Sequence, residues 1–126
     1  MTRIQTLRAL LLFEAATFVV AATTHFGGIV DGYAHRKAAI AETVIAVALL
    51  VGLAISLRSG WALEAALGTQ AFALFGVLVG LFTIAVGVGP RTAPDVAYHV
   101  GIAAVLATGI ALAARAGPGR AAPAGS

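Results

Sequence analysis

The sequence has 126 residues, of which 60% are hydrophobic and only 10% are charged. Soluble domains contain about 25% charged residues, so the composition predicts an integral membrane protein without a separate soluble domain. The net charge of +3 comes from Arg and Lys residues that mostly stand alone at the ends of apolar segments. That placement excludes nucleic acid as a partner and indicates contact with membrane lipids. The absence of cysteine excludes thiolate chemistry and Cys-based metal sites.

Four apolar segments predict an all-α fold, a bundle of four transmembrane helices. The predicted spans are residues 10–30, 38–57, 61–87 and 96–114, each close to the twenty or so residues that a bilayer requires. Pro90 and Pro94 prevent the last two spans from forming one continuous helix. Residues 115–126 are mostly Gly, Pro and Ala, so we predict a disordered C-terminal tail.

Positively charged residues beside the spans predict the orientation, because such residues accumulate on the cytoplasmic side of a membrane. More of them lie on the side of the two termini than on the opposite side. Both termini are therefore predicted to be cytoplasmic in a multi-pass protein of the cell membrane. The first group is Arg3, Arg8, Arg58, Arg115 and Arg120, and the second is Arg36, Lys37 and Arg91.

The two halves of the chain resemble each other, which predicts two tandem repeats of two helices each. Displacing the first span by 50 positions pairs Glu14 with Glu64, and displacing the second by 57 positions pairs Arg58 with Arg115. Such halves would share one topology. The alternative is that alanine-rich apolar segments match each other through composition alone.

Small residues recur every three or four positions in the last three spans. Membrane helices associate through close backbone approach along such faces, so these faces are predicted helix contacts. Some of them are also compatible with a homo-oligomer or with docking to a larger membrane complex. The small residues are Ala48, Gly52 and Ser56 in the second span, Thr69, Ala73, Gly76, Gly80, Thr83 and Gly87 in the third, and Ala97, Gly101, Ala104, Thr108 and Ala111 in the fourth.

Glu14 and His25 are the polar residues that stand out in the first span. They are eleven residues apart, and at 100° per residue they lie on one helix face. A charged side chain at the centre of a membrane helix costs roughly 2.5–3.5 kcal/mol. Both side chains are therefore predicted to face protein or water. Two further intramembrane polar residues have simpler explanations, Glu64 as an interfacial carboxylate and Gln70 as an interhelical hydrogen-bonding residue.

His25, Glu42 and His99 converge at one level near the extracytoplasmic side of the predicted bundle. Two imidazoles and a carboxylate suit a transition metal, and His25 with His99 would also suit the two axial positions of a haem. We therefore predict that these three residues bind a metal, a haem or a small lipophilic ligand. The alternative is a purely structural role, in which Glu42 interacts with a helix N-terminus and Asp95 is an N-cap.

The sequence thus favours a binding or redox module over two other functions. One is a non-catalytic accessory or scaffold subunit of a membrane complex, and the other is a proton-linked small transporter that uses Glu14, Glu64 and the outer cluster. Acid–base catalysis on a lipid-like substrate is less favoured, and no residue is assigned a catalytic role.

Overall fold

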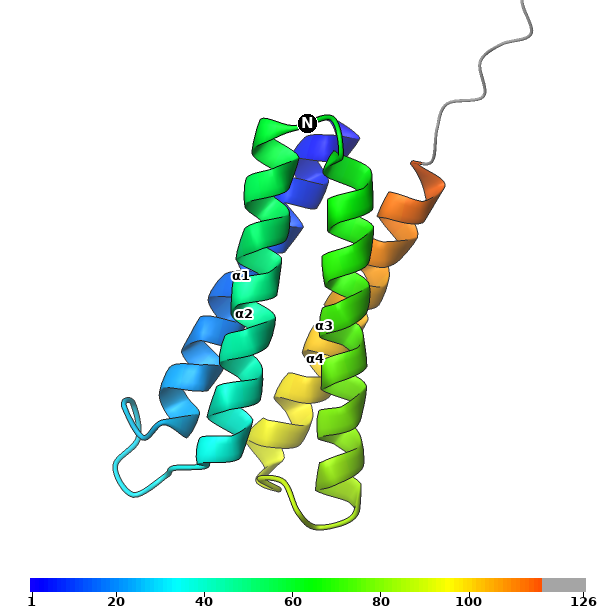
Figure 1. Cartoon of the computed structure of the whole chain (residues 1–126). Helices are drawn as coiled ribbons and strands as arrows, with labels where there is room; N and C mark the ends of the chain where they lie inside the picture. The colour runs from blue at the N-terminus through cyan, green and yellow to red at the C-terminus, as the bar shows by residue number, and fades with distance from the viewer. Residues whose placement is uncertain (117–126) are drawn as a thin grey trace, which may run out of the picture.

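The computed structural model describes residues 1–116, which form four long helices and the segments that connect them. The helices are α1 (Arg3–His25), α2 (Arg36–Arg58), α3 (Ala62–Ala85) and α4 (Ala93–Arg115). The helices alternate in direction, and α1–α2, α2–α3 and α3–α4 pack against each other, with smaller contacts of α1 with α4 and α3 (Figure 1). The all-helical bundle predicted from the sequence is confirmed.

All four helices are long and apolar enough to cross a membrane, consistent with a multi-pass membrane protein. Their outward faces carry large apolar side chains such as Phe13, Phe75 and Phe82, which are more than half exposed. In a bilayer such side chains face lipid, since they would be unfavourable in water. The interior of the bundle is an apolar core that includes Leu11, Phe18 and other buried residues.

The bundle has two different ends. One end holds the α1–α2 connection, residues 26–35, and the α3–α4 connection, residues 86–92; we call it the two-loop end, at the bottom of Figure 1. The other end holds the N-terminus and the short α2–α3 turn, residues 59–61. Which end faces the cytoplasm remains a prediction from the charge distribution.

Helix α1 begins seven residues earlier and ends five residues earlier than predicted, at Arg3 and His25. At its start, Thr2 and Gln5 form a capping box, each side chain accepting a hydrogen bond from the backbone N–H of the other. Such caps satisfy backbone donors that a helix start leaves unpaired. At its end, Gly27 takes a φ of +82°, a conformation that glycine adopts readily and that terminates the helix.

Helix α4 begins at Ala93 instead of the predicted residue 96. Thr92 is the N-cap and Asp95 is the third helical residue of a second capping box, so the prediction of Asp95 as the N-cap is wrong. Pro94 lies in the first turn, where its missing N–H is not required. The predicted disordered tail lies outside the described residues except for Arg115, which ends α4, and Ala116.

Glycines on both helices allow α2 and α3 to pack closely. A Cβ added at Gly52 would lie 2.5 Å from Thr69 Oγ1, and one added at Gly76 would lie 2.6 Å from Ile45 Cδ1. The predicted contact face of α3 is therefore used. The predicted face of α4 is not, because its members are all exposed and a Cβ at Gly101 would meet no atom within 4 Å. Within the bundle, the face formed by Ala97, Gly101, Ala104, Thr108 and Ala111 is therefore not a helix contact, and its use by a second subunit stays a prediction.

A polar contact crosses the bundle near the middle of α1 and α3. Glu14 and Gln70 are fully buried, and Gln70 Nε2 donates to both carboxylate oxygens of Glu14 at 3.0 and 3.2 Å. Gln70 thus makes the interhelical hydrogen bond that its type suggests. Glu64, by contrast, is exposed. The two positions paired by the proposed repeat therefore lie in different environments, and the repeat itself stays a prediction.

Candidate functional site

His25 and Glu42, two of the three predicted site residues, meet inside the two-loop end. His25 is the last residue of α1 and is 3% exposed; Glu42 lies in the second turn of α2 and is 5% exposed. His25 Nδ1 is 2.7 Å from Glu42 Oε2. The single-face argument for α1 is confirmed, since Glu14 and His25 both point into the bundle.

Asp95 completes this contact from the opposite side of the imidazole ring. His25 Nε2 is 3.1 Å from Asp95 Oδ1, and Asp95 is 5% exposed. The ring thus lies between carboxylates from α2 and α4, and it joins three helices. We call Glu42, His25, Asp95 and the neighbouring Tyr33 the polar cluster.

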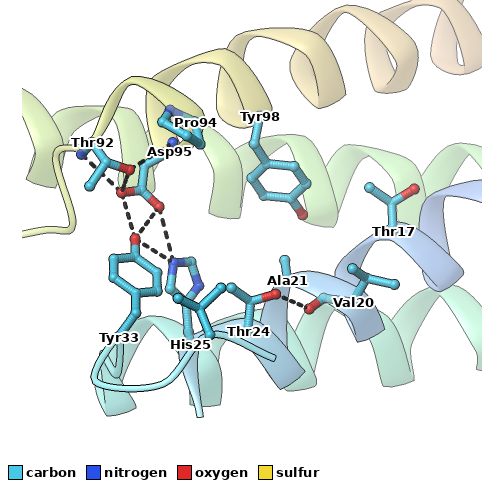
Figure 2. Close-up of a pocket in the computed structure, with 11 residues that line it drawn as sticks. Thr17, Val20, Ala21, Thr24, His25, Tyr33, Thr92, Pro94, Asp95 and Tyr98 are labelled. Atoms are coloured by element: carbon cyan, nitrogen blue, oxygen red, sulfur yellow. Dashed lines mark hydrogen bonds and ion pairs between the residues drawn. The ribbon is translucent and has the colours of Figure 1, made fainter. Parts of the chain in front are cut away.

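Tyr33 belongs to this cluster although the sequence did not single it out. It comes from the α1–α2 connection, and its hydroxyl donates to Asp95, whose two oxygens lie 2.6 Å away (Figure 2). Thr92 supplies two further donors, with its N–H at 2.9 Å and its hydroxyl at 2.5 Å from Asp95 Oδ2. Burial, together with the hydrogen bond to Asp95, raises the pKa of Tyr33 to about 12. A tyrosine near a membrane surface normally indicates an interfacial anchor, so its residue type carried no signal for this role.

His99, the third predicted residue, faces a different side of the bundle. Its Nδ1 lies 2.7 Å from the backbone carbonyl of Asp95, and a carbonyl can only accept, so Nδ1 carries the proton. In the neutral ring Nε2 is then an acceptor. Nε2 is packed against α3, where a Cβ added at Gly80 would lie 2.7 Å from it.

The geometry does not assemble the predicted metal or haem ligands around one point. Both nitrogens of His25 are directed at carboxylates, so neither is free to ligate, and His99 directs Nε2 at α3. Among residues 1–116, no group of three or more His, Asp or Glu side chains is arranged to hold a metal ion. Metal or haem binding by His25, Glu42 and His99 therefore gains no support from the described structure.

A cavity of about 450 Å³ lies between α1 and α4 beside the polar cluster. Its walls are mostly apolar, with hydroxyl groups interspersed along them. Figure 2 shows His25, Tyr33 and Asp95 of the cluster at one end of the cavity and Thr17 and Val20 at the other. The lining residues are Thr17, Val20, Ala21, Thr24, His25, Val30, Tyr33, Thr92, Pro94, Asp95 and Tyr98; we call this the α1–α4 cavity.

A second cavity, of about 190 Å³, lies on the other side of the cluster against α2 and α3. Glu42 and His99 line it, Lys37 and His35 lie at the two-loop end, and Tyr98 borders both cavities. We call it the α2–α3 cavity. The polar cluster thus separates two hollow regions of the protein.

The cluster has the composition of a proton-sharing unit. Each of the two His25–carboxylate contacts requires one hydrogen, yet a neutral imidazole supplies only one. Both contacts are satisfied either by an imidazolium between two carboxylates or by a neutral imidazole with one protonated carboxylic acid. These arrangements hold the same number of protons, so a proton can change its position within the cluster without changing the total charge.

Comparison of the chain with known protein families, curated proteins and solved structures finds no match in any of the three.

Proposed function

We propose that the protein binds a small lipophilic molecule carrying an oxygen-containing polar group, in the α1–α4 cavity. The observation that carries this proposal is the combination of an apolar cavity of about 450 Å³ with a buried polar cluster at one end. Sites for small molecules are typically cavities of this size, mostly apolar, with a few polar groups that orient the ligand.

The hydrogen-bonding groups of the cavity favour such a ligand. The hydroxyls of Thr17 and Thr24 donate to carbonyls of their own helix, and Tyr33 donates to Asp95. These three oxygens retain lone pairs that accept from a ligand hydroxyl.

The shape of the cavity favours a molecule that enters from the bilayer. Thr17 and His25 are eight residues apart on α1, which corresponds to about 12 Å along the helix. The cavity therefore runs along the helices, parallel to lipid chains in a membrane. A ligand would place its polar group at the two-loop end and its apolar body toward the middle of the bundle.

The test is to identify what co-purifies with the protein from its own membranes in mild detergent. An optical spectrum, metal analysis and mass spectrometry of the organic extract are recorded for the wild type and for Ala21→Phe, which fills the cavity. Ala16→Phe is the matched control, because residue 16 is on the same helix but exposed and outside the cavity. We expect a stoichiometric organic ligand in wild type and Ala16→Phe and its loss in Ala21→Phe. Equal retention in both variants, or no ligand in any sample, contradicts the proposal.

A second candidate, proton-linked transport, is favoured by a buried carboxylate halfway along the bundle. Glu14 is the middle residue of α1, is fully buried, and has Gln70 as its only side-chain partner among residues 1–116. The polar cluster lies at one end of the same helix. Ionisable groups buried at more than one depth are typical of proton pathways. If the protein is a proton-linked transporter, proteoliposomes should show a flux driven by a pH gradient. Glu14→Gln should abolish this flux, and the exposed control Glu64→Gln should preserve it. Equal fluxes in these variants, or none in the wild type, oppose it.

A further inference from the structure

The α2–α3 cavity contains polar atoms that the protein itself leaves unpaired. Oε2 of Glu42 contacts His25, but Oε1 is buried with no hydrogen-bond partner among the described residues, and the same is true of the Tyr98 hydroxyl. Both residues line the cavity, together with His99, whose Nε2 is an acceptor in the neutral ring. Leaving a buried polar atom without a partner is costly, so Glu42 Oε1 and the Tyr98 hydroxyl point to an occupant that pairs with them.

Water has the chemistry that these atoms require. Water can donate to Glu42 Oε1 and to His99 Nε2 and can accept from the Tyr98 hydroxyl, and buried water normally has two to four polar partners. The cavity volume of about 190 Å³ holds several molecules at about 30 Å³ each. His35 and Lys37 line the cavity at the two-loop end, where the bundle meets the aqueous phase.

We propose that the α2–α3 cavity is a hydrated proton-exchange site through which the polar cluster exchanges protons with the aqueous phase at the two-loop end. The starting state has a neutral Glu42 with its hydrogen on Oε2, facing His25 Nδ1, and a neutral His25 ring with its hydrogen on Nε2, facing Asp95 Oδ1. A hydronium ion in the cavity gives its proton to Glu42 Oε1 and becomes water, while Glu42 Oε2 releases its proton to His25 Nδ1 and His25 Nε2 releases its proton to Asp95 Oδ1. Glu42 and His25 end with the same number of protons as they began with, and Asp95 has gained the one that entered.

The groups around Glu42 are compatible with this route. From α1 it faces His25, and from α4 the nearby groups are Asp95, Tyr98 and His99. Lys37 and His35 line the aqueous end of the cavity, and from α3 the polar lining residue is Thr83. Thr83 has an aliphatic hydroxyl, which is not a titratable group and which donates to the Gly80 carbonyl at 2.7 Å, so it does not compete for the proton. The imidazole of His25 is the only titratable group that bonds to both Glu42 and Asp95 within residues 1–116.

This inference concerns water and protons and does not depend on a ligand in the α1–α4 cavity. It is tested on the full chain in detergent, with the histidine rings labelled with ¹⁵N. Saturation transfer from water measures how fast the proton on His25 Nδ1 exchanges. Ala38→Phe fills the α2–α3 cavity, since Ala38 lines it and is half-buried. Ala107→Phe is the control, because residue 107 is exposed and lines neither cavity.

We expect measurable exchange in wild type and Ala107→Phe and a decrease of about tenfold or more in Ala38→Phe, where exchange requires local opening of the bundle. Glu42→Gln should slow exchange as well, because a carboxamide keeps a hydrogen-bond acceptor but does not carry the proton, whereas the exposed control Glu64→Gln should not. Unchanged exchange in Ala38→Phe overturns the inference, and so does undetectable exchange in the wild type. Slower exchange only in Ala21→Phe would also overturn it, by placing the water route in the other cavity. Ligand retention, the test of the proposed function, is measured separately and is unaffected by these outcomes.

Discussion

Gly109 of α4 is the position where a single methyl group should have the largest effect on the buried contact between Glu14 and Gln70. A Cβ added at residue 109 would lie 2.8 Å from Gln70 Cδ, with Nε2 closer still. Gln70 is fully buried, so its amide has no free space into which it can move. Gly109→Ala therefore requires either the loss of the hydrogen bond to Glu14 or a separation of α3 from α4.

The magnitude follows from the cheaper of these two responses. A buried polar group left without its partner costs about 1–3 kcal/mol, and overpacking a close contact costs about 1–3 kcal/mol. Replacing glycine by alanine within a helix returns about 0.5–1 kcal/mol. We therefore expect Gly109→Ala to lower the free energy of unfolding by up to about 2.5 kcal/mol, which is the cost of about 1–3 kcal/mol less the gain of about 0.5–1 kcal/mol.

Gly101 provides the matched control on the same helix. A Cβ added there meets nothing within 4 Å, so Gly101→Ala should leave stability unchanged or raise it by up to about 1 kcal/mol. The assay is reversible unfolding of the detergent-solubilised protein in increasing SDS, followed by circular dichroism. Combining Gly109→Ala with Gln70→Ala removes the steric conflict, so the double variant should lose less than the sum of the single variants. Equal stability of Gly109→Ala and Gly101→Ala would refute the reasoning.

Three further predictions concern the two-loop end. In a Tyr98→Phe variant, the tyrosinate absorbance of Tyr33 should titrate with a midpoint near 12 instead of the usual value of about 10; a midpoint at the usual value would contradict its burial beside Asp95. Because the folded-state pKa of Tyr33 is the higher one, its contribution to stability is complete below about pH 10 and is lost as the pH rises through about 12, a loss that Tyr33→Phe should abolish. Thr92→Ala removes an N-cap and should lower the free energy of unfolding by about 0.5–2 kcal/mol, whereas Thr23→Ala, at an exposed position, should change it by less than about 0.5 kcal/mol. His25→Ala leaves Glu42 and Asp95 buried without their shared partner and should be more destabilising than His99→Ala, by SDS unfolding; the reverse order would show that the cluster does not hold the helices together.

The sequence was sufficient to predict the helices but not their ends. The four apolar segments are long, and their composition is far from that of a soluble protein, so their existence did not depend on any tertiary contact. The ends depend on a few local interactions, such as the capping boxes at Thr2 and Thr92 and the positive φ of Gly27. Hydropathy does not register these interactions, because Thr, Gln and Gly are neither strongly apolar nor charged.

The candidate site was predicted only in part, for a similar reason. The spacing of Glu14 and His25 places both on one face of α1, and helix geometry alone determines that result. The meeting of His25 with Glu42 required only that α1 and α2 be neighbours of opposite direction. Asp95 was assigned to a helix cap, and its carboxylate does bond to the cap residue, but it also contacts His25 from another helix.

Tertiary structure alone decided which groups point where around the bundle axis. The position of Tyr33 depends on the path of the α1–α2 connection, and the direction of His99 depends on its bond to the Asp95 carbonyl and on the space that Gly80 provides. The exposure of the small-residue face of α4 likewise depends on how that helix is rotated about its axis. The period of small or polar residues defines a face of a helix, but every helix in a membrane offers several faces of similar apolar character. The rotation is selected by which side chains interlock, so the sequence determined four membrane-length helices with buried Glu14 and His25, and packing determined the polar cluster and its two cavities.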